Sequence, residues 1–406
     1  MSKCIFFCVP AQGHVNPQLA LVDALVKKGE EVIYYCAPAF KEKIEKTGAE
    51  FRLLTTKYDR YIDEFGLIVG LNIVQIERLL MDVSNDIIAG LSGIVRDEKP
   101  DYIISDVITY YGAAAAHANK VPLITFFPVF CVTRGITGSL PLSFMLRILG
   151  QVISAPNHLI RLLKGAARLN KYMGDYPVSL QNAASHGSEM NIVSIPGFFQ
   201  FRADAFAKDK YIFTGPMLYY KRETPDFPVE NAAGKKFIYI SLGTVYNKRP
   251  KFFAQCFKAF EKTDYRVIMS MPEAITRGLK DKIPDNFIVR PYVPQLQVLQ
   301  YVDAFISHGG MNSVQESLYF GVPMVIIPQS TDQYLNGFRL ARLGAGICLK
   351  KETPDAKELL SAVEKVIANT AYKDRAKELS GMSKSAGGVE AAVKAIEGFK
   401  EKHNIL

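Results

Sequence analysis

A polar stretch with two glycines, HGGMNSVQES, directly follows the short apolar run from Ala304 to Ser307. The apolar run predicts a buried strand, and the stretch after it predicts a turn that opens a helix. Gly309 and Gly310 permit a tight turn and a close approach of the backbone to a ligand. The first N–H groups of such a helix lack intrahelical partners, so the stretch predicts an anion site, with phosphate as the natural occupant.

Four polar side chains accompany this turn and could bind more than a bare phosphate. His308, Asn312 and Ser313 supply donors. Because His308, Asn312 and Glu316 recur every four residues, we expect them along one face once the helix begins. The Glu316 carboxylate could accept from two ribose hydroxyls, which favours a nucleoside diphosphate. Taken singly, these residues also fit a turn, a helix cap at Asn312 or Ser313, and a solvated glutamate.

Two other stretches could complete a nucleotide site. A predicted strand ends at Ser241 and is followed by Gly243 and Thr244, a combination of hydroxyls and glycine that can form a second anion nest. Farther along, the ring of Tyr292 could stack on a base, and Gln295 could bind the edge of that base. Each of these two stretches is also compatible with ordinary packing.

A histidine and an aspartate near the ends of two other predicted strands could carry acid–base chemistry. His14 lies in PAQGHVNP, at the start of the first predicted helix, and Asp106 ends a later strand. Because parallel strands end at the same edge of a sheet, Asp106 could reach His14 and fix its tautomer. The pair could act as a general base, although a histidine at a helix start can also be a simple polar contact. The chain has no Asp-x-Asp triplet, so we expect no metal at the site.

Short apolar runs alternate along the chain with longer segments of helical period, which is typical of parallel sheets covered by helices on both faces. The expected strands are Lys3–Val9, Glu31–Tyr35, Tyr102–Ser105, Pro122–Phe126, Asn191–Ser194, Tyr211–Phe213, Phe237–Ser241, Arg266–Ser270, Phe287–Arg290, Ala304–Ser307, Pro323–Ile327 and Gly346–Leu349. We expect an α/β protein of two doubly wound, Rossmann-like domains facing a cleft. The boundaries are 1–214 for the N-terminal domain, 215–236 for a linker rich in Pro, Gly and charge, 237–388 for the C-terminal domain, and 389–406 for a last helix packing back on the N-terminal domain.

The composition is that of an ordinary globular protein, with 49% hydrophobic and 22% charged residues among 406. The net charge of +9 is spread along the chain, so we expect no nucleic-acid partner. The six cysteines are scattered and lack metal-ligand spacing, which predicts reduced core residues in a cytoplasmic protein. No apolar run approaches the ~18 residues of a membrane span. The amphipathic, basic segment at 146–173 could lie on a membrane surface, but such segments more often cover a core.

Four motifs, taken in order, resemble the donor-binding signature of the family 1 UDP-dependent glycosyltransferases. They are YVPQLQVL from Tyr292, HGGMNSVQE from His308, GVP from Gly321 and PQSTDQ from Pro328. The closest likeness is to the bacterial macrolide and flavonoid glycosyltransferases, and it extends from the first strand to the tail. It implies a GT-B fold with an acceptor-binding N-terminal domain and a donor-binding C-terminal domain. It also implies an inverting transfer that uses a UDP-sugar as co-substrate and requires no metal or other cofactor.

The resemblance implies a set of donor-binding residues. They are Ser241, Thr244, Tyr292, Val293, Gln295, His308, Gly310, Asn312, Ser313, Glu316, Asp332 and Gln333. Tyr292 would stack on uracil, and Glu316 would hold the ribose. Asp332 and Gln333 would bind the sugar hydroxyls, although Asp332 could also cap the helix that follows. The residues around His308 would hold the diphosphate together with Thr244.

At the catalytic end, the resemblance implies that His14 deprotonates the acceptor hydroxyl and that Asp106 orients His14. The chain also departs from the family. Plant members have tryptophan where this chain has Tyr292, Met311 and Ser330, and the chain contains no tryptophan. Stacking on the base is expected to survive with tyrosine, whereas a sugar contact at Ser330 is lost.

We therefore expect transfer of a hexosyl group, glucose from UDP-glucose, to a hydroxyl of an apolar acceptor such as a flavonoid, phenol or macrolide. The segments Phe126–Met145 and Ile195–Phe201 are apolar and aromatic, which suggests the walls of an acceptor pocket. The alternatives are a membrane-associated lipid glycosyltransferase and a nucleotide-sugar epimerase of the same fold. A dinucleotide-dependent dehydrogenase is disfavoured, because PAQGHVNP lacks the three-glycine fingerprint. We expect a monomer, with a dimer as the alternative.

Overall fold

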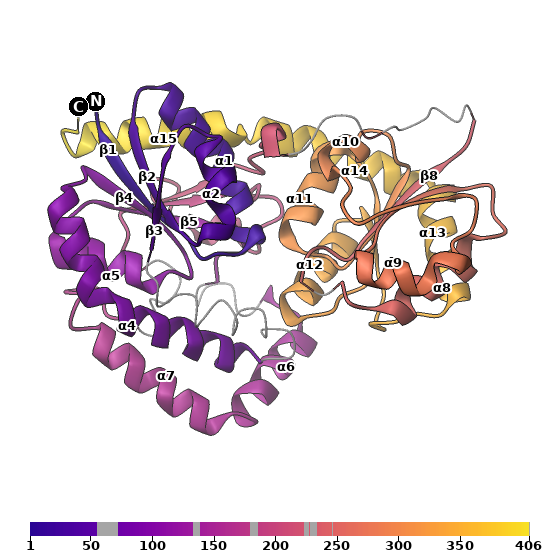
Figure 1. The fold of residues 1–406 in the computed structure, drawn as a ribbon, viewed down its shortest axis with the longest axis horizontal. Helices are drawn as coiled ribbons and strands as arrows, with labels where there is room; N and C mark the ends of the chain where they lie inside the picture. Colours follow the sequence, from indigo (N-terminus) through magenta and orange to yellow (C-terminus); the bar gives the residue numbers. More distant parts are fainter. Residues whose placement is uncertain are drawn as a thin grey trace. The chain divides into compact units, whose positions relative to one another are not determined.

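The computed structural model describes residues 1–54, 72–132, 139–178, 186–222, 227, 234–245 and 247–405. The chain divides into two compact units, which are labelled by their elements in Figure 1. Unit 1 comprises Met1–Tyr219 and Ala386–Leu406, and unit 2 comprises Tyr220–Ser385. Of the expected linker, residues 223–226 and 228–233 lie outside the described residues, as do residues 133–138 of one expected pocket wall.

Unit 1 contains a seven-stranded parallel sheet in the order β3-β2-β1-β4-β5-β6-β7. Its strands are β1 (Lys3–Phe7), β2 (Glu31–Cys36), β3 (Glu50–Leu53), β4 (Tyr102–Asp106), β5 (Leu123–Phe127), β6 (Met190–Val193) and β7 (Tyr211–Phe213). Its helices are α1 (Gln12–Lys27), α2 (Lys41–Glu45), α4 (Ile73–Glu98), α5 (Tyr110–Asn119), α6 (Leu142–Ile153), α7 (Pro156–Leu169) and α15 (Gly388–Lys402).

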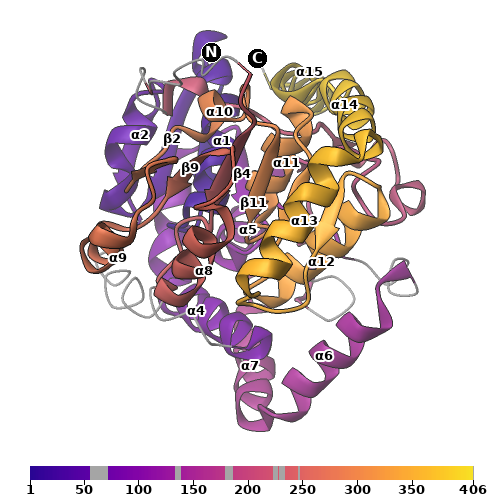
Figure 2. The ribbon, with the colours of Figure 1, turned by 90° about the vertical axis from the view of Figure 1, so that its right-hand side faces the viewer.

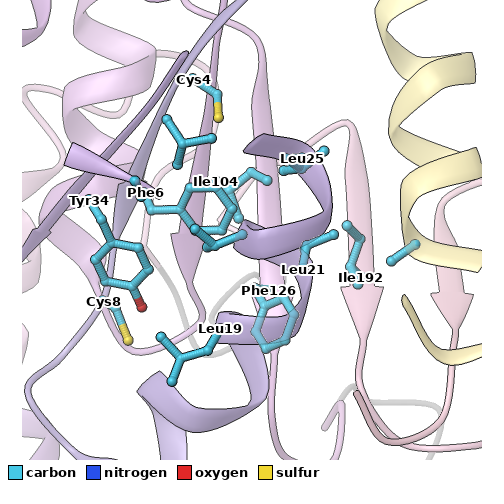
Figure 3. Close-up of a cluster of buried hydrophobic side chains, with 14 of the residues drawn as sticks. Cys4, Phe6, Cys8, Leu19, Leu21, Leu25, Tyr34, Ile104, Phe126 and Ile192 are labelled. Carbon is cyan, nitrogen blue, oxygen red and sulfur yellow. The ribbon is translucent and has the colours of Figure 1, made fainter. Parts of the chain in front are cut away.

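The first strand shows why helices cover both faces of this sheet. Successive side chains of a strand point to opposite faces, and every residue of β1 after Lys3 is buried. Cys4 and Phe6 join the core under α1 and α15, whereas Ile5 and Phe7 join the core under α4 and α5. Figure 3 shows the first of these cores, in which the labelled side chains of α1 pack against those of β1, β4, β5 and β6.

Three helices of unit 1 show how the two faces of its sheet are covered. α15 returns to unit 1 at the end of the chain and packs on α1 and β1, where Ile396 and Phe399 are buried. An ion pair of 2.9 Å joins Lys400 of α15 to Glu30. On the other face, α7 lies beyond α4 from the sheet in both views (Figure 1, Figure 2). No helix among the described residues is both long and apolar enough to cross a membrane.

Unit 2 contains a six-stranded parallel sheet in the order β10-β9-β8-β11-β12-β13. Its strands are β8 (Phe237–Ser241), β9 (Arg266–Ser270), β10 (Phe287–Arg290), β11 (Ala304–Ser307), β12 (Met324–Ile326) and β13 (Gly346–Cys348). Its helices are α8 (Pro250–Phe260), α9 (Glu273–Leu279), α10 (Gln295–Val298), α11 (Met311–Phe320), α12 (Thr331–Arg342), α13 (Ala356–Ala368) and α14 (Thr370–Ser385). The prediction of two doubly wound parallel-sheet units is confirmed.

Two local predictions need correction. The strand β3 was not predicted, because Glu50–Leu53 lies at the sheet edge and none of its four residues is buried, so it lacks the apolar run of a central strand. α11 begins at Met311, so His308 belongs to the turn before the helix. Only Asn312 and Glu316 share the expected helical face.

Candidate active site

The parallel pairing of β1 and β4 brings His14 and Asp106 together in unit 1. Phe7 of β1 lies beside Ser105 of β4, so both strands end at the same edge of the sheet. His14 lies in the first turn of α1, and its Nδ1 lies 3.0 and 2.9 Å from the two carboxylate oxygens of Asp106. The Asp106 side chain is fully buried, whereas 18% of the His14 side chain is exposed. A neutral imidazole that donates from Nδ1 to the carboxylate has its acceptor lone pair at Nε2.

The Asp106 carboxylate has two further donors. The backbone N–H of Ile108 donates to Oδ1 at 3.1 Å, and Nε2 of Gln18 donates to Oδ2 at 3.2 Å. Gln18 lies one turn after His14 on α1. A further hydrogen bond fixes its side chain, because the Tyr34 hydroxyl donates to Gln18 Oε1 at 3.0 Å. Gln18 and Tyr34 are both completely buried, so the His14–Asp106 pair rests on a fixed polar network.

The turn before α11 in unit 2 has the geometry that the two glycines predict. Gly309 has a φ of +86°, which L-residues rarely adopt. Gly310 is the residue before the helix, and it has no side chain with which to cap the first N–H groups. The Nδ2 of Asn336, on α12, donates to the Gly309 carbonyl at 2.8 Å and so fixes the turn from outside. Neither Asn312 nor Ser313 is a cap, which excludes that alternative.

His308 packs between two glycine backbones at the ends of adjacent strands. β8 and β11 are paired through Ser241 and Ser307, so Gly243 follows one strand where His308 follows the other. A Cβ on Gly243 would lie 2.6 Å from the His308 ring, and a Cβ on Gly310 would lie 2.5 Å from its Nε2. Although part of the residue is exposed, desolvation of the ring lowers the pKa of His308 to about 4, against a weaker opposing effect of the Ser241 backbone. At neutral pH His308 is therefore an uncharged hydrogen-bond partner.

The expected base and ribose residues form a second connected group. Nε2 of Gln295 donates to Glu316 Oε2 at 2.7 Å and lies 3.5 Å from Ser313 Oγ, so the start of α10 meets α11 here. Glu316 and Val293 are buried, which rules out the solvated-glutamate alternative. By contrast, 57% of Tyr292 is exposed.

The remaining expected donor residues lie at the start of α12 and after β8. Gln333 is buried, and its Oε1 accepts from the backbone N–H of Gln329 at 2.8 Å. Asp332 is exposed and accepts from the Ser330 hydroxyl. Ser330 is the residue that precedes the helix, so Asp332 is not its cap. Thr244 is exposed, and the His308 ring has a hydrogen-bond contact with Ser307 instead.

Part of the expected acceptor wall is core. Phe199 and Phe201 are buried, and both rings pack on Phe130 with centroids 5.4 and 5.0 Å apart. Gln200 ties the same segment to Cys131 by two hydrogen bonds of 3.0 and 2.8 Å. The stretch Ile195–Phe201 therefore packs against the segment after β5, and its buried Phe199 and Phe201 are accounted for without a ligand.

Sequence reasoning missed Gln18, Tyr34 and Asn336. Gln18 could have been found, because it lies four residues after His14 and is a polar residue within the apolar run of α1. Tyr34 had no such signal, since an aromatic residue in a buried strand is ordinary. Asn336 follows Gln333 by three residues, but its contact with Gly309 depends on how α12 packs beside the turn.

Comparison with known proteins identifies the family. Residues 254–395 match the family model described as erythromycin biosynthesis protein CIII-like, C-terminal domain. The chain is 32% identical to the NDP-glycosyltransferase YjiC of Bacillus subtilis, over 97% of this chain and 96% of that protein. It is 30% identical to an uncharacterised UDP-glucosyltransferase, YojK, of the same organism, over 99% and 98% of the two chains.

A solved structure, that of the glycosyltransferase of kitacinnamycin, superposes on the chain with a TM-score of 0.84 at 25% identity, covering 98% of both chains. Both halves of the chain thus share the two parallel-sheet units of known glycosyltransferases. The chain belongs to the family 1 UDP-dependent glycosyltransferases of GT-B fold and is an enzyme related to the macrolide and flavonoid glycosyltransferases.

Proposed function

We propose that this glycosyltransferase transfers glucose from UDP-glucose to a hydroxyl group of an apolar natural product, with inversion at the anomeric carbon. The observation that carries the proposal is the His14–Asp106 pair, in which a buried carboxylate accepts from Nδ1 at 2.9 Å. Nε2 of His14 then takes the proton of the acceptor hydroxyl. The acceptor oxygen forms a bond to the anomeric carbon as the bond from that carbon to the β-phosphate oxygen breaks, and UDP departs.

Asp106 has two tasks in this mechanism. It holds His14 in the tautomer whose Nε2 accepts a proton, and its negative charge stabilises the imidazolium that forms. Because one displacement completes the transfer, no covalent intermediate is required and the configuration inverts. The proton leaves His14 to solvent after the glycoside departs.

Unit 2 supplies the donor site in this proposal. The N–H groups at the start of α11 and the neutral His308 donate to the diphosphate, and they stabilise the charge that develops on departing UDP. Tyr292 offers an exposed ring to uracil, and Asp332 with Gln333 binds the glucose hydroxyls. Glu316, oriented by Gln295, accepts from the ribose. A carboxylate that accepts from both ribose hydroxyls loses one partner with a 2′-deoxyribose, which favours UDP over dTDP.

Two relatives support the sugar and the acceptor class, since one is named as a UDP-glucosyltransferase and the other is the glycosyltransferase of kitacinnamycin. The experiment is to incubate the protein with a flavonol or macrolide aglycone and either UDP-glucose or dTDP-glucose, and to determine the product by mass and by NMR. We expect a β-glucoside, formed with UDP-glucose at a kcat/KM roughly 10–100-fold higher than with dTDP-glucose, as the loss of one hydrogen bond to a charged group implies. An α-glucoside would contradict inversion, and equal use of both donors would contradict the role of Glu316.

A further inference from the structure

The two helices α6 and α7 present an apolar surface to solvent. Six large side chains of these helices are each between 51 and 70% exposed: Leu142, Leu146, Leu149, Ile153, Ile160 and Leu163. We call this set the α6–α7 surface. No residue of α6 is buried, although eight of its twelve residues are large and apolar. Such clusters on a folded protein mark surfaces that bind a partner or a membrane.

Both helices are attached to α4 through contacts on their other sides. The exposed apolar residues therefore belong to helices that are packed on unit 1. The side-chain carbonyl of Gln151, on α6, accepts from the backbone N–H of Ile73, at the start of α4, at 3.2 Å. Asn85 of α4 donates to the Gly165 carbonyl of α7 at 3.0 Å. A Cβ on Gly165 would lie 2.6 Å from the Met81 side chain, which shows how closely α7 packs on α4.

The exposed residues form an apolar stripe along α6 and a basic stripe along α7. On α6, Leu142, Leu146, Leu149 and Ile153 follow the helical repeat and share one face. Along α7 and just past its end, four basic residues follow the same repeat, and the first two directly succeed Ile160 and Leu163; they are Arg161, Lys164, Arg168 and Lys171. All four are exposed, and none forms an ion pair with a residue that the structure describes.

The surface also lacks negative charge of its own. The chain has no aspartate or glutamate between Asp106 and Asp175, a segment that includes α6 and α7 entirely. A surface that combines exposed leucines and isoleucines with cations outside ion pairs, and has no carboxylates, complements a bilayer that carries anionic headgroups. A second copy of the chain is a poor occupant, because the two basic stripes would repel each other.

We propose that the α6–α7 surface docks the enzyme on anionic lipid membranes, with the six apolar side chains in the interfacial region and the basic stripe at the headgroups. The binding is peripheral, since α6 and α7 are amphipathic helices of 12 and 14 residues. The proposal concerns where the enzyme works and does not depend on which sugar or acceptor it uses.

The test is flotation of the full chain with vesicles of phosphatidylcholine alone or with phosphatidylglycerol added. We expect binding only to the vesicles that contain phosphatidylglycerol, and weaker binding at higher salt. The triple variant Arg161→Gln, Lys164→Gln, Arg168→Gln should bind roughly 100-fold less tightly, at about fivefold per cation. The variant Leu146→Ser with Leu149→Ser should bind at least about tenfold less tightly.

A matched control removes three exposed cations from unit 2 instead, by Lys262→Gln, Lys280→Gln and Lys282→Gln. If the wild type ignores phosphatidylglycerol, or if the control loses as much binding as the α7 variant, the proposal is wrong. A concentration-dependent dimer that the Leu146→Ser, Leu149→Ser variant dissociates would assign the surface to a second copy and also overturn it. Turnover of a water-soluble acceptor should be the same in all variants, which separates docking from catalysis.

Discussion

At the scale of single residues, the central feature is a carboxylate that receives four hydrogen bonds or close polar contacts from three groups. His14 accounts for two of them, and Ile108 and Gln18 supply the others. A buried carboxylate needs such partners, because an unpaired buried charge is strongly unfavourable. The network therefore fixes both the position of Asp106 and the direction of His14.

Gln18 and Tyr34 should accordingly affect catalysis by positioning Asp106 and His14, without contacting a substrate. We predict that Gln18→Leu lowers kcat about tenfold, the loss expected for one hydrogen bond, while the KM for UDP-glucose stays within about twofold. Tyr34→Phe should lower kcat by a smaller factor, because Tyr34 acts on Asp106 only through Gln18.

Tyr102→Phe is the matched control for this prediction. The Tyr102 hydroxyl donates to Glu30 at 2.6 Å, at the start of β4 and away from Asp106, so its loss should lower stability and leave kcat unchanged. If Gln18→Leu and Tyr102→Phe lower kcat alike, Gln18 has only a structural role.

The donor site also predicts independence from metal ions, because backbone N–H groups and neutral side chains meet the diphosphate in our proposal. Dialysis against EDTA should leave kcat within about twofold of the untreated value. A large loss that Mg²⁺ or Mn²⁺ restores would contradict this assignment of the diphosphate contacts.

At the scale of elements, the proposed site residues lie in strand–turn–helix connections. The glycines in these connections permit the turn and also leave room for the neighbouring His308 side chain. Gly310 has an ordinary φ of −59°, so alanine is allowed there by the backbone but would collide with His308. We predict that Gly310→Ala raises the KM for UDP-glucose about tenfold or more, measured by initial rates, because His308 or the turn must shift.

The control for Gly310→Ala is Gly381→Ala, in the middle of α14, where nothing lies within 4 Å of the added Cβ. Alanine is a better helix former than glycine, so this change should raise the free energy of unfolding by up to about 1 kcal/mol and leave KM unaltered. An unchanged KM in Gly310→Ala would show that His308 does not contact the donor.

The elements themselves were largely predictable from sequence. Central strands such as β8, β9 and β11 are continuous apolar runs bounded by polar residues, and their predicted limits match the structure. The edge strand β3 was missed because a half-exposed strand such as EFRL lacks that pattern. Asp106 could be placed beside His14 because strand ends in a parallel sheet coincide, whereas the roles of Tyr34 and Asn336 depend on packing between elements that no local pattern encodes.

At the scale of the whole molecule, each unit contains a histidine whose titration couples its stability to pH. Desolvation lowers the pKa of His186 in unit 1 and of His308 in unit 2 to about 4, from an ordinary 6.5. Between these values the unfolded chain binds more protons than the folded chain, so stability falls as pH falls from about 6.5 towards 4. We predict a loss on the order of 1–2 kcal/mol per histidine between pH 7 and pH 5, measured by denaturant unfolding. The smaller loss should belong to His308, which is partly exposed.

The variant His186→Asn isolates the effect in unit 1. Its backbone has a φ of +50°, which asparagine tolerates better than most residues, and the backbone carbonyl can still accept from His117. The variant should lose less stability on acidification in the transition of unit 1, while that of unit 2 keeps the wild-type dependence. An identical pH dependence in wild type and variant would exclude His186 as its source.

The most direct test of the central claim is to measure UDP release from UDP-glucose, with and without a flavonol acceptor, in wild type, His14→Ala and Asp106→Asn, alongside UDP affinity by calorimetry. We predict acceptor-dependent release in the wild type that falls by at least about 100-fold in His14→Ala and substantially in Asp106→Asn, with UDP affinity unchanged because the proposed donor site lies in unit 2. Release that is indifferent to the acceptor, or that survives the loss of His14, would contradict the assignment of His14 as the base that activates the acceptor.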